Sequence, residues 1–381
     1  MSNKNNTGEE LQGQSKMVTI NTIQRTALVE RLCVNRMYSH DRIVPYDVDN
    51  LYPNKIKNIA LRSGTIKGAI QTQSAFVRGE GFDGMDIIIN RDGNTLWDIL
   101  KFMAQQKSMF GGYSFHFNLN AFGEITEIQT LPFEWERWHR DLDKIVVNKD
   151  WGKRRKFKEE KTYDAFNKNS IDGQLERVEN IEDYDGQVLY MNDSIHEIYT
   201  TTGWDAVIDD AQFEAEAKIY SLSSIQNDYS LSGIVIIPKY LEDDEEVQNW
   251  IKELKKDTGT ANAGGIRVFG VTPSEEMRAW PWFKPISRNN IDNMFENQKK
   301  TAKENIYHWF RQPSILNGMS ESGMFNTDDY YQAFTYYNNQ TETERKDLEK
   351  QLSWILSNSI FPLDKVEIKP KTFEINGQAT D

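Results

Sequence analysis

Apolar residues recur at helical spacing in two stretches of the N-terminal third of the sequence. The first predicted helix covers residues 52–79. The second covers 95–110, where Asn94 or Thr95 supplies the N-cap and Gly111 ends the helix. The apolar positions that define them are Ile56, Ile59, Ala60, Ile66, Ile70 and Phe76 in the first, and Leu96, Ile99, Leu100 and Met103 in the second. A one-sided pattern of this kind is typical of helices that cover a core.

Alternation of apolar and polar residues replaces the helical pattern after Gly111 and predicts strands. Residues 114–120 and 124–131 are expected to pair as an antiparallel hairpin. Further strands are predicted at 144–148, 187–191 and 194–201. A charged insert over 150–186 interrupts these strands. Residues 40–205 are therefore interpreted as one α+β domain.

The second half of the chain combines long helices with one small β–α–β unit. A helix is predicted over 209–231 and a longer one over 287–310. Between them the pattern predicts a strand at 233–238, a helix at 243–257, a second strand at 265–271 and an extended segment at 277–285. After Pro313 comes a stretch rich in Gly, Ser and Met, and a last helix is predicted over 329–358.

Composition narrows the classes of function without choosing one. The net charge of −13 over 381 residues argues against a protein that wraps DNA with a basic surface. The single cysteine, Cys33, excludes an intrachain disulfide and fits a reducing compartment. No apolar run reaches the length of a membrane span, and residues 1–16 lack the apolar core of a signal peptide. We therefore expect a soluble intracellular product with no membrane partner.

Motifs of the common enzyme classes are absent from the sequence. The five histidines form no HExxH pair, and there is no GxSxG elbow, GxxxxGK[ST] loop or GxGxxG turn. We expect no catalysis, no metal and no cofactor.

The segment FEWERWHR at 133–140 leaves an enzymatic alternative open. Acidic residues beside tryptophans suit a carbohydrate-active enzyme with paired carboxylates, here near Trp135 or Trp204. In the competing interpretation Trp135 and Trp138 close a core. The charged residues of the segment are then solvated: Glu134, Glu136, Arg137 and Arg140.

Two local signatures accompany this order of elements. SLSSIQNDYSLSGIVIIP at 221–238 is a helix that leads through a small-residue turn into an apolar strand ending in proline. IYHWFRQPSILNGMSESGMFNTDDYYQAF at 306–334 joins a helix end, an aromatic–x–x–Pro segment, a Gly/Ser loop, an Asn and an acidic helix start. The matching positions are Phe310, Pro313, Gly318, Asn326 and Asp329. With the element order over 40–358, these signatures resemble the portal proteins of tailed bacteriophages. DNLYPNKIKNIALRSGTIKGAI at 49–70 also resembles the start of the wing in portals of phages with Bacteroidetes-type hosts.

The resemblance implies a fold with a wing, stem helices, a small β–α–β clip and a tunnel loop. The implied parts of the first half are a partly disordered N-terminal segment (1–39), the wing (40–205) and a stem helix (206–231). They are followed by the clip (232–275), an extended segment with a second stem helix (276–311), the tunnel loop (312–328), a helix toward the crown (329–358) and a tail (359–381). The chain departs from the pattern in two places. Little follows Asn358, so the crown is small or missing, and the insert at 150–186 has no counterpart.

The resemblance also implies three sets of functional residues. The tunnel loop would face DNA with Asn317, Gly318, Met319, Ser320, Glu321, Ser322, Gly323 and Met324. The clip would meet the packaging motor and the adaptor with Glu245, Glu246, Asn249, Trp250, Lys252 and Glu253. Lumen-facing stem positions would be Lys299, Lys300 and Lys303, which repeat around a ring as a positive belt. The alternative for these lysines is pairing along the helix with Glu296 and Glu304.

The implied function is a non-enzymatic ring, usually of twelve copies, at one capsid vertex. Double-stranded DNA would be packaged and ejected through it. The implied partners are other copies of the chain, terminase, head–tail adaptor or neck proteins and the major capsid protein. The implied location is the virion, with the host cytoplasm during assembly. An acidic conduit suits DNA that must slide without being gripped. The alternatives are the carbohydrate-active enzyme and another virion or scaffold protein.

Overall fold

The structure is a computed structural model that describes residues 42–152, 160–168, 184–193, 198–226, 233–238, 267–271, 283–285, 291–318, 327–375 and 378–380. The chain divides into two units, Met1–Leu32 and Cys33–Asp381, and every described residue belongs to the second unit. Across the described residues, no helix combines the length and the apolarity that crossing a membrane requires.

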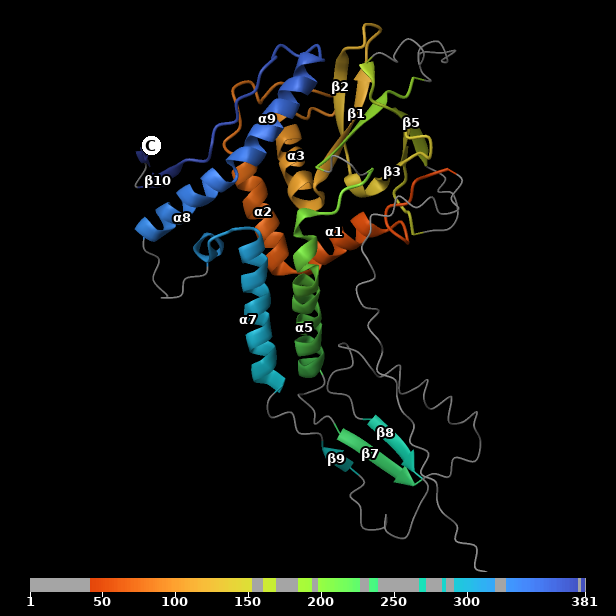
Figure 1. Cartoon of the computed structure of the whole chain (residues 1–381), viewed down its shortest axis with the longest axis vertical. Coiled ribbons are helices and arrows are strands. Elements are labelled where there is room, and N and C mark those ends of the chain that lie inside the picture. The colour runs from red at the N-terminus through yellow and green to blue at the C-terminus, as the bar shows by residue number, and fades with distance from the viewer. Residues whose placement is uncertain are drawn as a thin grey trace, which may run out of the picture. The chain divides into compact units, whose positions relative to one another are not determined.

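A mixed sheet of six strands has the order β2–β1–β6–β5–β4–β3 (Figure 1). Its strands are β1 (Gly112–Leu119), β2 (Ile125–Leu131), β3 (Glu136–Trp138), β4 (Lys144–Val147), β5 (Lys161–Ala165) and β6 (Gln187–Asn192). Neighbouring strands run antiparallel, except that β5 and β6 run parallel. The predicted hairpin is confirmed as β1 and β2, with Phe117 opposite Ile128.

One core lies between this sheet and two helices, α3 (Leu96–Phe110) and α9 (Glu342–Ser357). Phe115, Phe117 and Leu119 point from one face of β1 into it, as the alternation predicts. Helix α3 agrees with its prediction: the Asp98 carboxylate accepts a hydrogen bond from the Thr95 backbone N–H at 3.0 Å, and Gly111 ends the helix with φ +75°. The predicted α+β class is confirmed.

Two predicted helices are each broken in the structure. The pattern over 52–79 is α1 (Tyr52–Arg62) and α2 (Gly64–Arg78), and the pattern over 329–358 is α8 (Thr327–Gln340) and α9. Ser63 has extended backbone, and its hydroxyl accepts a hydrogen bond from the Ile66 N–H, so it acts as the N-cap of α2. Thr341 separates α8 from α9. Apolar spacing continues across both breaks, which is why it suggests single helices.

The prediction of strands after β4 was partly wrong. Residues 198–201, the described part of the predicted strand 194–201, are not a strand. The ring of Tyr199 instead stacks on Tyr46 with centroids 4.1 Å apart. Strand β5 was missed because it lies inside the charged insert, where alternation is weak.

A second core joins α1, α2 and the short helix η4 (Gly203–Val207) to the first turn of α5 (Ile208–Gln226) and the last turn of α7 (Ile291–Trp309). The ring of Phe295 on α7 stacks on Tyr220 of α5 at 5.0 Å. Near the opposite ends, the Asn305 amide donates to the Asp210 carboxylate at 3.3 Å. The two helices therefore lie side by side and run in opposite directions (Figure 1).

A separate sheet has the order β8–β7–β9. Strand β7 (Gly233–Pro238) pairs in parallel with β8 (Arg267–Val271) and antiparallel with β9 (Phe283–Pro285). The two predicted strands of the β–α–β unit are confirmed, whereas the helix predicted at 243–257 lies outside the described residues. Near the C-terminal end, β10 (Phe373–Ile375) pairs antiparallel with β11 (Gln378–Thr380).

Candidate functional site

Helix α7 ends in a tight, hydrogen-bonded turn. The Arg311 N–H donates to the His308 carbonyl and the Gln312 N–H donates to the Tyr307 carbonyl, each at 3.0 Å. Arg311 has φ +52°, the left-handed conformation that commonly terminates a helix. Pro313 follows and cannot continue the helix, and a single short turn, η7 (Ser314–Asn317), leads to Gly318.

A buried amide anchors this turn to two other helices. Gln312 is 5% exposed, and its Nε2 donates to the Ala69 carbonyl of α2 at 2.7 Å and to the Tyr337 hydroxyl of α8 at 2.8 Å. Its Oε1 accepts from Asn317 Nδ2 at 3.1 Å. The turn after α7 is therefore fixed against both neighbours by one side chain.

The predicted tunnel-loop residues are only partly described. Asn317 Oδ1 accepts a hydrogen bond from Thr72 of α2 at 3.2 Å, so its side chain belongs to the anchored turn. Gly318 has φ +74°, a conformation that favours glycine. Met319, Ser320, Glu321, Ser322, Gly323 and Met324 lie outside the described residues, as do the predicted clip residues Glu245, Glu246, Asn249, Trp250, Lys252 and Glu253.

The three predicted stem lysines do not share one position on α7. Ala302 and Ile306 form the buried side of the helix. Lys299 and Lys303 are half-buried at the border of that side, whereas Lys300 is exposed. Lys300 lies 3.7 Å from Glu304, which is the pairing along the helix that competed with the lumen-facing interpretation. A pair this exposed contributes little to stability.

Glu214 of α5 joins this helix to the break between α1 and α2. Its carboxylate accepts hydrogen bonds from Ser63 Oγ at 2.5 Å, the Thr65 N–H at 3.2 Å and Lys218 Nζ at 2.9 Å. Burial raises the pKa of Glu214, but the hydrogen bonds from Ser63 and Lys218 outweigh it and hold the pKa below its usual value. The carboxylate is therefore charged at neutral pH and holds three elements together.

The charged residues of the segment at 133–140 are mostly buried, which corrects the expectation that they are solvated. Glu134, Glu136 and Arg137 are at most 3% exposed, and of the four only Arg140 is exposed. The Arg137 guanidinium donates to the Asn50 carbonyl at 2.7 Å and to the Asn50 Oδ1 at 2.6 Å. It also lies over the ring of Trp151, 5.1 Å from its centroid. Arg137 thus ties the sheet to the segment that precedes α1.

The two glutamates of this segment are structural in the same way. Glu134 accepts a hydrogen bond from Lys57, and Glu136 accepts one from Ser114 Oγ at 2.6 Å. Trp204, the other tryptophan of the enzymatic alternative, is fully buried and donates to the Met109 carbonyl at 3.0 Å. A glycosidase needs its two acids beside a substrate cleft, and these acids are enclosed in the core.

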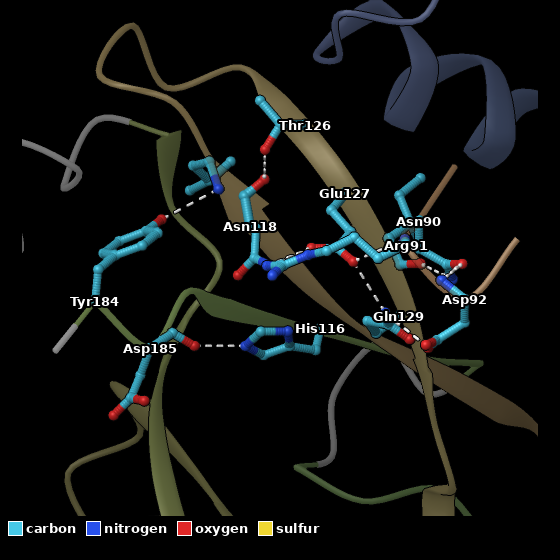
Figure 2. A network of polar contacts seen from close by, with 12 residues as sticks. Asn90, Arg91, Asp92, His116, Asn118, Thr126, Glu127, Gln129, Tyr184 and Asp185 are labelled. Carbon is cyan, nitrogen blue, oxygen red and sulfur yellow. Dashed lines mark hydrogen bonds and ion pairs between the residues drawn. The ribbon is translucent and has the colours of Figure 1, made fainter. Parts of the chain in front are cut away.

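A polar network on the other face of β1 and β2 was not singled out from the sequence (Figure 2). Glu127 accepts hydrogen bonds from Asn118 Nδ2 at 2.6 Å, from Gln129 Nε2 at 3.1 Å and from the Arg91 N–H at 3.2 Å. The network borders an open cavity of about 900 Å³ that Tyr184 also lines. Because neighbouring groups donate hydrogen bonds to the Glu127 carboxylate, it is suited to holding the β1–β2 hairpin against the turn at 90–92. The sequence does contain a signal for this network. In a strand, alternate residues share one face, so the polar positions of β1 and β2 are expected on the same side of the sheet.

The turn between β3 and β4 groups three potential metal ligands, also unexpected from the sequence. In the described part of the chain, His139, Asp141 and Asp143 have ligand atoms within 4.8 Å of one another. Both aspartates are exposed, and His139 Nδ1 lies 3.2 Å from Asp141 Oδ2. The contacts within the turn account for this arrangement without an ion.

Comparison with known proteins gives similarity in structure alone. No protein-family model and no curated protein matches the chain. A chain in the virion of a native gene transfer agent particle has a TM-score of 0.51 and 13% identity, over 84% of this chain and 83% of that chain. A chain in the neck of the native particle, computed with C12 symmetry, has a TM-score of 0.49 and 14% identity, over 85% and 86%. An HK97 family phage portal protein from Corynebacterium diphtheriae has a TM-score of 0.38 and 10% identity, over 78% and 90%.

The first of these similarities extends over most of both chains. At 13% identity, the similarity concerns the fold. The chain therefore shares its fold with a protein of the gene transfer agent virion.

Proposed function

We propose that the chain is a portal protein, which assembles as a ring at one capsid vertex and forms a channel for double-stranded DNA. The observation that carries the proposal is the antiparallel pair α5–α7, which ends in an anchored turn, within a fold shared with a virion protein. Two long helices held side by side give each subunit a stiff wall, and the turn sets where the chain leaves that wall.

The parts of the chain have separate roles in this proposal. Residues 40–205 form the wing, α5 and α7 the stem, 232–275 the clip and 312–328 the tunnel loop, and the two helices of 329–358, α8 and α9, lead toward the crown. The clip meets terminase during packaging and head–tail adaptor or neck proteins afterwards, and the wing contacts the major capsid protein. The ring holds twelve copies and belongs to the virion of a tailed phage, after assembly in the host cytoplasm.

Charge suits transport of DNA in this arrangement. Each cation placed on a phosphate adds affinity through counterion release, which would slow movement of the duplex. The net charge of −13 per chain, repeated around a ring, keeps the duplex from adhering to the wall. The half-buried Lys299 and Lys303 give limited local attraction, and Lys300 is balanced by Glu304. No chemical step is required of the protein, so the proposed role is non-enzymatic.

Native mass spectrometry of the purified full-length chain tests the proposal. We expect a closed oligomer of about a dozen subunits, since portal rings close through contacts between identical subunits. A species that stays monomeric across the accessible concentration range would rule out the ring. Electron micrographs then separate a portal from another virion or scaffold protein, because a portal ring has a central hole.

A further inference from the structure

Two acidic residues near the start of α9 lie close to a third acid at the end of β6. Glu344 and Asp347 are three residues apart and therefore share one side of α9. Helix α9 packs beside α2 and α3 (Figure 1). Lys107 of α3 forms an ion pair at 2.5 Å with Asp193, which directly follows β6. The charges of Lys107, Asp193 and Asp347 all act on the Glu344 carboxyl group, so these elements meet at the start of α9.

Glu344 has no positive partner of its own. It is half-buried, and both of its carboxylate oxygens accept from one neutral donor, Gln73 Nε2 of α2, each at 3.2 Å. Burial raises the pKa of Glu344 and the like charges of Asp193 and Asp347 add to this, whereas Lys107 and Gln73 offset only part of it. Lys107 is already paired with Asp193. A carboxylate removed from water needs a compensating charge, so this position favours a further cation.

A buried hydroxyl points to the same place independently. Tyr113 of β1 is 2% exposed, and its hydroxyl is buried without a hydrogen-bond partner among the described residues. After burial itself, the charges that raise the pKa of Tyr113 are those of Asp193 and Asp347, so the hydroxyl lies beside these carboxylates. The Oε1 atom of Gln351, one turn after Asp347 on the same side of α9, is also buried without a partner. Buried polar atoms of this kind are usually satisfied by an ordered water or an ion.

The available ligand atoms select the kind of ion. All of them are oxygens, from three carboxylates, a phenol and an amide, and such a set favours the hard cations Mg²⁺ and Ca²⁺. In the described part of the chain, only the histidine and two aspartates of the β3–β4 turn bring three ligand atoms within 4.8 Å of one another. The acids around α9 are therefore too far apart to enclose a bare ion. Ca²⁺ takes about six to eight oxygen ligands, whereas Mg²⁺ keeps several waters and needs one or two carboxylates.

We propose that Glu344, Asp347 and Asp193 bind a hydrated magnesium ion, an inference that is independent of the proposed function. A Glu344 oxygen contacts the ion, and waters on the ion donate hydrogen bonds to the other two carboxylates and to the Tyr113 hydroxyl oxygen. The ion links α9 to α3 through the Lys107–Asp193 pair and to the end of β6. No metal was expected from the sequence, because these residues come from elements far apart along the chain.

A competing role for Glu344 and Asp347 is to balance the positive N-terminal end of the α9 dipole. That role requires charge on the acids but no ion, so Glu344→Gln would destabilise the protein equally with and without magnesium. The magnesium site predicts a different order at neutral pH. Without magnesium, Glu344→Gln should be at least as stable as the wild type, because it removes a half-buried charge and its repulsion from Asp193. With magnesium, the wild type should be the more stable of the two.

Thermal unfolding of the full-length protein is measured over a series of MgCl₂ concentrations, with the ionic strength held constant by KCl. A ligand of the folded chain raises the midpoint progressively as its concentration exceeds the dissociation constant. The wild type should show this rise, and Glu344→Gln and Asp347→Asn should lose it. Asp347 is exposed, so its variant should keep the fold. Tyr113→Phe should weaken the apparent magnesium affinity by about tenfold.

A matched control is available at the β3–β4 turn. Asp141→Asn removes an exposed carboxylate from the other group of potential metal ligands and should respond to magnesium like the wild type. Isothermal titration calorimetry should give one magnesium ion per chain. Because protons compete with the ion for Glu344, the affinity should fall as the pH is lowered from about 8 to about 5.5. Tyr113→Phe should keep this pH dependence, since it retains all three acids.

Several results would overturn the site. One is a wild-type midpoint that MgCl₂ raises no more than KCl does at equal ionic strength, and another is a rise that survives both Glu344→Gln and Asp347→Asn. A rise that Asp141→Asn removes would place the ion at the β3–β4 turn instead. Stabilisation by CaCl₂ that equals or exceeds that by MgCl₂ would overturn the choice of a hydrated magnesium ion. None of these results bears on the proposed function, which the oligomeric state decides.

Discussion

At the scale of single residues, Glu136 is a buried carboxyl group that forms no ion pair within the described residues. Its Oε1 accepts from Ser114, and its Oε2 has no hydrogen-bond partner and is buried. The adjacent Arg137 directs its guanidinium to Asn50 and to backbone carbonyls. Burial raises the pKa of Glu136 well above its usual range, and the hydrogen bond from Ser114 and the charge of Arg137 offset only part of this. Burial therefore favours the protonated form of this group in the folded protein.

Glu136→Gln is expected to change the pH dependence of stability. Above the unfolded-state pKa of about 4.3, the unfolded chain loses this proton while the folded chain keeps it. The free energy of unfolding of the wild type therefore falls with rising pH, by up to about 1.4 kcal/mol per unit, until the raised folded pKa is reached. Glutamine carries no proton to lose, so the variant gains stability relative to the wild type as pH rises from 5 to 8.

Urea denaturation at several pH values measures this difference. The two proteins should be most similar near pH 4 and diverge above it. Parallel stability curves over that range would show that Glu136 does not titrate between the folded and unfolded states as described.

Arg311→Gly should stabilise the protein. A non-glycine residue in the left-handed region costs about 1 kcal/mol, and its exposed contact with Gln340 contributes little, so removing the Cβ yields a net gain of roughly that size. Thermal denaturation should show a higher midpoint for this variant. An unchanged or lower midpoint would mean that the Arg311 side chain contributes more to the fold than its single described contact indicates.

At the scale of elements, the turn after α7 depends on Gln312. Gln312→Ala removes the donor to the Ala69 carbonyl and the Tyr337 hydroxyl, and the acceptor for the Asn317 amide. The expected loss of stability is about 2–3 kcal/mol. Asn305→Ala is the control, because it removes an exposed amide contact on α7 and should cost less than about 0.5 kcal/mol. Equal effects of the two variants would contradict the anchoring role.

Elements with complete local signals were predictable from the sequence, and elements decided by distant contacts were not. Helix α3 and the β1–β2 hairpin have their caps, turns and periodicity within a few residues. The break at Ser63 is stabilised by Glu214, about 150 residues later in the chain, and the break at Thr341 by Arg345, which donates to the Phe76 carbonyl of α2. No local pattern carries that information.

The candidate site also combines local signals, which were predictable, with distant contacts, which were not. Pro313 is a local signal in the sequence that predicts the end of α7. The burial of Gln312 depends on Ala69 and Tyr337, and the conformation of Arg311 follows from the closed turn, so neither was foreseen. The solvation expected of Glu136 and Arg137 was wrong for the same cause, because their partners Ser114 and Asn50 are remote in sequence.

At the scale of the whole molecule, the central claim is that many copies of the chain surround one axis. The described unit supplies an antiparallel helix pair and a fixed turn at its end, and the proposed transport function requires that both be repeated around a hole. In the proposed ring, the exposed face of α7, with Lys300, His308 and the adjoining Arg311, would be the wall that DNA passes.

Electron cryomicroscopy of the purified full-length oligomer tests this claim most directly, through the position of α7 relative to the symmetry axis. We predict a closed ring with a central hole wide enough for a DNA duplex, with Lys300 and Arg311 facing the hole. A structure in which α7 turns this face to the outside of the ring, or particles with no common axis, would contradict it.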